Sequence, residues 1–102
     1  MKIRYKRTAL RDIQQKYDYI ANVLKNKKAA QTLVDRILHA VSQLTDNPMM
    51  GASLNSKFDV NSDLRFLIVA KQLVFYRIED MDIIFIVRVL DGRQDYTSIL
   101  FE

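Results

Sequence analysis

Hydrophobic residues gather in three apolar runs in the second half of the chain, at Leu64–Ala70, Leu73–Ile78 and Ile83–Leu90. The runs are rich in Ile, Val, Phe and Tyr, which suit a pleated and partly buried surface. Short polar connectors separate them, Lys71-Gln72 between the first two and residues 79–82 between the last two. Because such short links join neighbouring strands in opposite directions, the pattern predicts a meander of three antiparallel strands.

An alternating pattern opens the chain. Ile3 and Tyr5 fall on one side, whereas Lys2, Arg4 and Lys6 fall on the other. A period of two residues is typical of a strand, because successive side chains point to opposite faces. The pattern therefore predicts a half-buried strand with a basic outer face.

A helical period follows this strand. Thr8 is predicted to be the N-cap, since its hydroxyl can satisfy a free backbone N–H of the first turn. Tyr19 and Val23 lie off the apolar stripe of this helix, so we expect them to be exposed or to meet a partner. The stripe itself consists of Leu10, Ile13, Tyr17, Ile20, Ala21 and Leu24.

A second helix is predicted after a turn at residues 26–28, where Asn26 tolerates a left-handed C-cap conformation. This helix ends before Pro48, because proline disfavours helix in the residue that precedes it. Two helices joined by a short link form an αα-hairpin that can cover one face of the sheet. The second apolar stripe consists of Ala30, Leu33, Val34, Ile37, Leu38, Val41 and Leu44.

The remaining segments are a polar loop and a short tail. Leu54 and Phe58 are expected to anchor the loop, and residues 93–101 fit both a short strand and a helical turn. The predicted fold class is α+β in the order β-α-α-β-β-β, with the N-terminal strand and αα-hairpin packed on an antiparallel sheet. Residues 1–102 form one domain, since a chain of this length builds a single core.

Composition indicates the cellular compartment of the protein and excludes some kinds of site. The chain has no cysteine, which excludes disulfides and thiolate metal sites and fits a reducing cytoplasm. Four basic residues lie within residues 1–7, but no apolar signal segment follows them, and no apolar stretch is long enough to span a membrane. We therefore expect a cytoplasmic protein without a membrane partner.

Charge is distributed unevenly along the chain. The net charge is +4, and residues 1–36 hold ten basic against three acidic residues. A basic half favours an acidic partner, either nucleic acid or protein, although a solvated face kept for solubility explains it equally well.

The order of these elements, together with several short motifs, resembles the RelE/ParE family of toxins from bacterial type II toxin–antitoxin pairs. The Tyr76-Arg77 pair and the closing Val-Leu-Asp-Gly-Arg at residues 89–93 resemble the ParE branch more than the RelE branch. The other motifs are Ala9-Leu-Arg-Asp-Ile13, Tyr19-Ile20, Ala29-Ala30, Asn47-Pro48, Gly51, Leu54, Asp63-Leu-Arg65, Val74-Phe-Tyr76, Ile86-Val-Arg88 and Asp95.

This resemblance implies a function. RelE-like members cut messenger RNA on the ribosome, whereas ParE-like members resemble inhibitors of DNA gyrase and perform no chemistry. Both are held inactive by a cognate antitoxin, and the complex represses its own promoter, so operator DNA is contacted only through the antitoxin complex. No cofactor is implied.

Cutting RNA through its own 2′-hydroxyl needs a base, a cation and an acid. The resemblance to RelE implies an arginine before the Val74–Tyr76 segment, but Leu73 stands there, and no Tyr or His occurs at Ile99–Phe101. His39 is expected on the exposed side of its helix, four residues from Asp35 and paired with it.

Arginine at position 88 interrupts an apolar run and is predicted to share a face with Ile84 and Ile86. Such a cation is costly unless it is paired or exposed, so we expect either a structural ion pair with an aspartate such as Asp63 or Asp95 or a contact with a partner. Cations in or beside the sheet are Arg65, Lys71, Arg77, Arg88 and Arg93.

The leading hypothesis is a ParE-like toxin that uses the open face of its sheet to bind DNA gyrase, while an amphipathic antitoxin segment covers helices and sheet. The residues expected to bind target or antitoxin are Arg65, Arg77, Arg88, Arg93 and Tyr96; Arg93 and Tyr96 are expected to be exposed. The alternative is a ribosome-dependent endoribonuclease acting on mRNA, with Arg65, Lys71, Arg88 and Arg93 as its catalytic cations. A further alternative is a non-toxic co-repressor. No spacing indicates a metal site.

Overall fold

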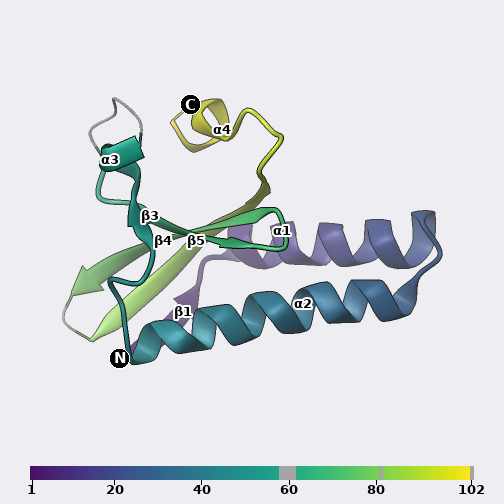
Figure 1. Cartoon of the computed structure of the whole chain (residues 1–102), viewed down its shortest axis with the longest axis horizontal. Coiled ribbons are helices and arrows are strands. Elements are labelled where there is room, and N and C mark those ends of the chain that lie inside the picture. Colours follow the sequence, from purple (N-terminus) through teal and green to yellow (C-terminus); the bar gives the residue numbers. More distant parts are fainter. Residues whose placement is uncertain (58–61, 81, 102) are drawn as a thin grey trace.

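The computed structural model describes residues 1–57, 62–80 and 82–101, and its strands lie between a long helical hairpin and two short helices (Figure 1). The predicted α+β class and element order are confirmed. The elements are β1 (Lys2–Tyr5), α1 (Arg7–Asp18), the π-helical turn η1 (Tyr19–Val23), α2 (Lys27–Ser42), the 3-10 turn η2 (Gln43–Thr45), β2 (Ala52–Ser53), α3 (Leu54–Lys57), β3 (Arg65–Val69), β4 (Gln72–Asp80), β5 (Ile83–Asp91) and α4 (Tyr96–Leu100).

The sheet has the strand order β1-β5-β4-β3-β2. The predicted meander of β3, β4 and β5 is antiparallel throughout, and β1 adds to it in parallel, with Ile3 opposite Ile84. Ala70 and Lys71 connect β3 to β4 with φ angles of 49° and 69°. Positive φ at both central residues is the signature of a type I′ hairpin turn, whose twist matches that of the strands.

A bulge in β5 reverses which side chains face the helices. Phe75 of β4 pairs with Arg88, but the next residue, Tyr76, pairs with Ile86, so Val87 is an extra residue. Arg88 therefore lies opposite Phe75, and the prediction that it shares a face with Ile86 is wrong. Strict alternation along the run predicts a shared face, and the extra residue Val87 breaks that alternation.

Both faces of the sheet carry a hydrophobic core. The face under the hairpin joins Ile13, Ile37, Val41 and Leu44 of the helices to strand residues such as Tyr76, and all of these are buried. The opposite face gathers a second set around Leu54, Phe66, Leu73, Phe75 and Leu90, over which α4 lays Tyr96, Ile99 and Leu100. The expectation of an open sheet face is thus wrong, because the tail forms a helix that covers part of it.

Several local details also differ from prediction. Helix α1 begins at Arg7, so Thr8 lies inside it and not at the N-cap. Asn26 is the N-cap of α2, and its side chain accepts a hydrogen bond from Ala29 N–H at 3.0 Å; Lys25 takes the left-handed conformation instead. Phe58, predicted to anchor the loop, lies outside the described residues.

The predicted apolar stripes of the two helices are confirmed at most positions and wrong at three. Leu10, Leu24 and Leu38 are exposed, because the hairpin extends beyond the strands at its far end and each helix presents a narrower face to the sheet (Figure 1). Tyr19 and Val23 are exposed, as expected.

Candidate functional site

Helix α1 completes the edge of β5 where β1 ends. Thr8 Oγ1 donates to the carbonyl of Val87 at 3.0 Å, Val89 N–H donates to Asp12 Oδ2 at 2.9 Å, and Lys16 Nζ donates to the carbonyl of Val89 at 2.7 Å. Thr8, Asp12 and Lys16 are four residues apart, and residues at this spacing lie on one face of a helix. The sequence therefore contains a signal that these three polar side chains point the same way. The three side chains satisfy backbone groups that an unpaired strand edge would leave exposed.

An ion pair between Asp12 and Arg88 joins helix to sheet. Arg88 donates from Nε to Asp12 Oδ2 at 2.7 Å and from an Nη to Asp12 Oδ1 at 2.9 Å. The Asp12 side chain is 7% exposed and that of Arg88 27%. The predicted structural ion pair with an aspartate is therefore present, and its acid is Asp12, which was not among the examples expected. The carboxylate that binds Arg88 therefore comes from α1, and not from the segment before β3 or from the tail.

Two polar side chains of the sheet hold the loop after α2. Arg65 Nε donates to the carbonyl of Gly51 at 3.0 Å, and Tyr76 Oη donates to the carbonyl of Pro48 at 2.8 Å. Gly51 N–H in turn donates to Tyr76 Oη at 2.9 Å. These bonds give Arg65 a structural role in the free protein.

A hollow beneath α4 holds two of the predicted site residues. Arg77 and Arg88 line a cavity of about 580 Å³ together with Ile99, Leu100 and Phe101 at the tail. Arg77 Nε donates to Glu79 Oε2 at 3.0 Å in an exposed pair. Tyr96, expected to be exposed, is half-buried, because its ring packs on Phe75 with the centroids 5.7 Å apart.

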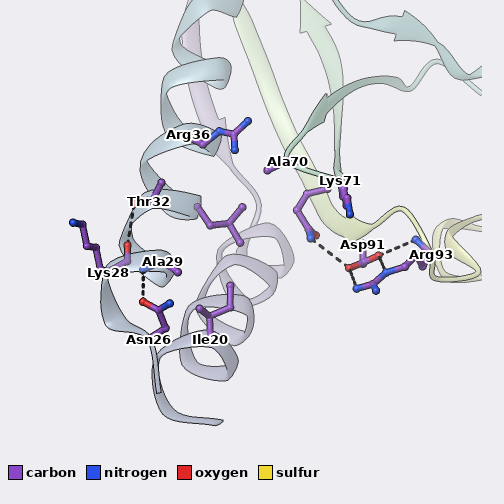
Figure 2. Close-up of a pocket in the computed structure, with 12 residues that line it drawn as sticks. Ile20, Asn26, Lys28, Ala29, Thr32, Arg36, Ala70, Lys71, Asp91 and Arg93 are labelled. Atoms are coloured by element: carbon purple, nitrogen blue, oxygen red, sulfur yellow. Dashed lines mark hydrogen bonds and ion pairs between the residues drawn. The ribbon is translucent and has the colours of Figure 1, made fainter. Parts of the chain in front are cut away.

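Lys71 and Arg93 lie elsewhere, in a groove between α2 and the β3–β4 turn. Figure 2 shows this groove, with Arg36 directed across it from α2 toward that turn. Its cavity has a volume of about 520 Å³. The Arg93 side chain is 87% exposed, as expected, although Nε and an Nη donate to the Asp91 carboxylate, both at 3.0 Å. These bonds hold the pKa of Asp91 well below its usual range.

The groups considered for RNA cleavage do not converge. Arg65 lies at the loop, Arg88 in the hollow beneath α4, and Lys71 and Arg93 in the groove beside α2. His39 is exposed on α2 near Gln43, and its expected partner Asp35 instead accepts a hydrogen bond from Gln31 at 2.8 Å. Within the described ranges, no group of three His, Cys, Asp or Glu side chains could hold a metal ion.

The helical hairpin on a five-stranded sheet places the chain in a class of small α+β folds already seen in a solved toxin–antitoxin structure. That structure, described as the chromosomal ParDE TA system from P. aeruginosa, superposes with a TM-score of 0.73 and 24% sequence identity; the match covers 89% of this chain and 95% of that chain. No curated protein matches the chain in sequence.

Residues 3–96 match the family described as ParE toxin of type II toxin-antitoxin system, parDE. The chain therefore belongs to the ParE toxin family, and the predicted RelE/ParE resemblance, on its ParE branch, is confirmed. Family membership implies a cognate antitoxin as partner. Among the described residues, no helix has the length and apolar character needed to cross a membrane.

Proposed function

We propose that this ParE-family toxin inhibits DNA gyrase by binding it, and that its cognate antitoxin prevents this contact. The observation that carries the proposal is the separation of the sheet cations into three places, so that they do not meet at one site. Cleavage of RNA needs a base and a cation at the same phosphate, whereas inhibition by contact needs only a complementary surface.

The hollow beneath α4 is the proposed contact with the target. It combines Arg77 with the apolar tail residues Ile99, Leu100 and Phe101, the last of which is exposed. Arginines beside apolar side chains are enriched among the residues that dominate binding energies. Arg65 and Arg88 are poor probes of this contact, because their substitution removes bonds that hold the fold.

Purified toxin is expected to keep a relaxed plasmid relaxed in the presence of gyrase and ATP. Arg77→Ala is expected to raise the toxin concentration for half-inhibition by about tenfold, since loss of an interfacial arginine commonly costs about 1.4 kcal/mol or more. The readout is supercoiling on an agarose gel. Arg11→Ala, which removes the same charge from the exposed face of α1, is expected to inhibit like the wild type.

Unchanged supercoiling at saturating, folded toxin would contradict the proposal. Cuts mapped in the message of programmed ribosomes would then favour the endoribonuclease. Absence of growth arrest on expression, with repression still requiring both chains, would favour the co-repressor.

A further inference from the structure

The groove between α2 and the β3–β4 turn continues beneath the tip of the helical hairpin. A second cavity of about 410 Å³ adjoins the first, whose volume is about 520 Å³. Each volume lies in the range of small-molecule sites. The groove has no lining residue in common with the hollow beneath α4. The two cavities form one elongated depression because they share the lining residues Ile20, Leu33, Gln72, Asp91 and Arg93 (Figure 2).

The end of the groove at α2 is cationic. Lys28 and Arg36 line it from α2 and Lys71 lines it from the β3–β4 turn, and all three residues are exposed. Figure 2 shows Arg36 directed across the groove toward that turn. The first turn of α2 also lines this end, through Asn26 and Ala29, and its residues 27–30 include no acid. Cations beside the N-terminal turn of a long helix favour a phosphate.

A carboxylate in the lining does not cancel this charge. Asp91 supplies the acidic group among the described residues that line the groove, and two N–H groups of Arg93 already donate to it, both at 3.0 Å. Lys16 adds a further cation to the second cavity, where its Nζ donates to the carbonyl of Val89 at 2.7 Å. The excess of positive charge therefore attracts an anion.

The other end of the groove, beneath the hairpin tip, is aromatic and apolar. Tyr19, Leu24 and Leu33 line it, and the exposed fractions of Tyr19 and Leu24 are 55% and 57%. An exposed tyrosine ring offers a face on which a planar base can stack, and every base has a face suited to this. Positive charge at one end and an aromatic ring at the other fit an anion that carries a planar group.

Gln72 lies between these two ends and offers a hydrogen-bond acceptor. The residue is 8% exposed and lines both cavities, and its Oε1 is buried without a hydrogen-bond partner in the described part of the chain. Its Nε2 lies 3.4 Å from Asp91 Oδ2, which fixes the amide orientation because a carboxylate only accepts. A buried acceptor without a donor costs free energy, and a ligand hydroxyl or N–H that bonds to it recovers that cost.

We propose that this groove is a site for a nucleoside phosphate. The phosphates bind Lys28, Arg36 and Lys71, and the base stacks on Tyr19 at the hairpin tip. Between them, a ribose hydroxyl donates to Gln72 Oε1. A nucleotide presents an anion, a hydrogen-bond donor and a planar ring in the order in which the groove presents cations, an acceptor and an aromatic side chain. The site goes beyond the proposed contact with gyrase and does not depend on it, because the hollow beneath α4 lies elsewhere.

Three probes separate the parts of this ligand. ATP carries all of them, tripolyphosphate lacks the sugar and the base, and adenosine lacks the phosphates. Calorimetry with the full-length toxin, without divalent cations, measures each affinity. ATP is expected to bind at least about tenfold more tightly than either fragment, because one molecule makes both sets of contacts. Equal affinities for ATP and tripolyphosphate would indicate a surface that takes any polyanion, and would overturn the nucleotide as the ligand.

Arg36→Gln is expected to weaken the binding of ATP and of tripolyphosphate alike, by about tenfold, because a charged bond to phosphate is lost. Arg36 is exposed, so the fold is expected to persist. Arg11→Gln removes the same charge from an exposed position of α1 outside the groove and is expected to bind both probes like the wild type. Equal affinities for the two variants would trace any binding to net charge and overturn the site.

Tyr19→Ala is expected to lower the affinity for ATP about tenfold and to leave that for tripolyphosphate unchanged, because only ATP carries a base to stack. Tyr19 is exposed, so this variant keeps the fold. Tripolyphosphate serves as the internal control. An unchanged affinity for ATP would overturn the placement of the base at the hairpin tip.

Gln72→Met is expected to raise the Tm of the free toxin while lowering its affinity for ATP. Methionine keeps the volume but removes the unpartnered acceptor, so the free protein gains stability and the complex loses a bond. A purely structural glutamine would not move the two quantities in opposite directions. An unchanged affinity for ATP, or a fall in Tm, would overturn the role given to Gln72.

Discussion

Replacing Asp12 by alanine is expected to lower the free energy of unfolding by about 3 kcal/mol. The carboxylate accepts two bonds from Arg88 and one from Val89 N–H, and its side chain is 7% exposed. Removal leaves a guanidinium and a backbone donor without their acceptor in a largely dry place. The value lies at the lower end of the range for buried pairs, because Arg88 keeps contact with water.

Urea unfolding followed by circular dichroism measures this loss. Asp35→Ala is the matched control, since its carboxylate lies on the exposed face of α2 and accepts from Gln31 within the same helix. Its expected effect is about 0.5 kcal/mol or less. In the double variant Asp12→Ala/Arg88→Ala, the loss is expected to be smaller than the sum of the single losses. Additive losses would show that the pair does not couple α1 to β5.

Replacing Gly51 by alanine is expected to destabilise the protein by about 3 kcal/mol. A Cβ at this position would lie 2.6 Å from Tyr76 Oη and 2.7 Å from the carbonyl oxygen of Phe66. Neither neighbour can withdraw, because Tyr76 is fully buried and Phe66 O belongs to the sheet backbone. The loop would therefore move away and lose its bonds to the Tyr76 hydroxyl.

Gly92→Ala provides the comparison, with the same substitution at a turn where the nearest atom is the Lys71 carbonyl oxygen at 3.1 Å. Neither glycine has a positive φ, so backbone strain does not separate the two variants. We expect Gly92→Ala to cost about 1 kcal/mol or less. Losses of equal size in thermal unfolding would show that the loop accommodates the added methyl group without losing its bonds to Tyr76.

Four of the five sheet cations already make bonds in the free protein, and this changes how the surface is interpreted. Arg65 binds the loop, Arg88 binds α1, Arg77 binds Glu79 and Arg93 binds Asp91. Arg65 donates to backbone carbonyls and Arg88 is held in a half-buried ion pair with Asp12. Arg93, in contrast, is exposed and can leave Asp91 to bind a carboxylate of a partner. Charge alone therefore overstates the number of residues available to partners.

The main strands and helices and their order could be predicted from the amino-acid sequence alone. The meander of β3 to β5, the strand β1 and the helical hairpin follow from local periods of two and about 3.6 residues, which depend only on neighbours along the chain. The ParE-like motifs depend on the same local order, and the family match confirms them. Arg93 was placed correctly at the surface because it follows a turn.

Which side chains meet could not be predicted in this way, because it depends on how distant segments fold together. Asp12 and Arg88 are 76 residues apart, and the bulge at Val87 that lets them pair leaves no mark on the local period. Gln72, in a connector by sequence, opens β4 and is buried in the folded chain, where it pairs with Asp91 of β5. Such pairings depend on register and on the packing of distant segments, and a period read along the chain carries no information about either.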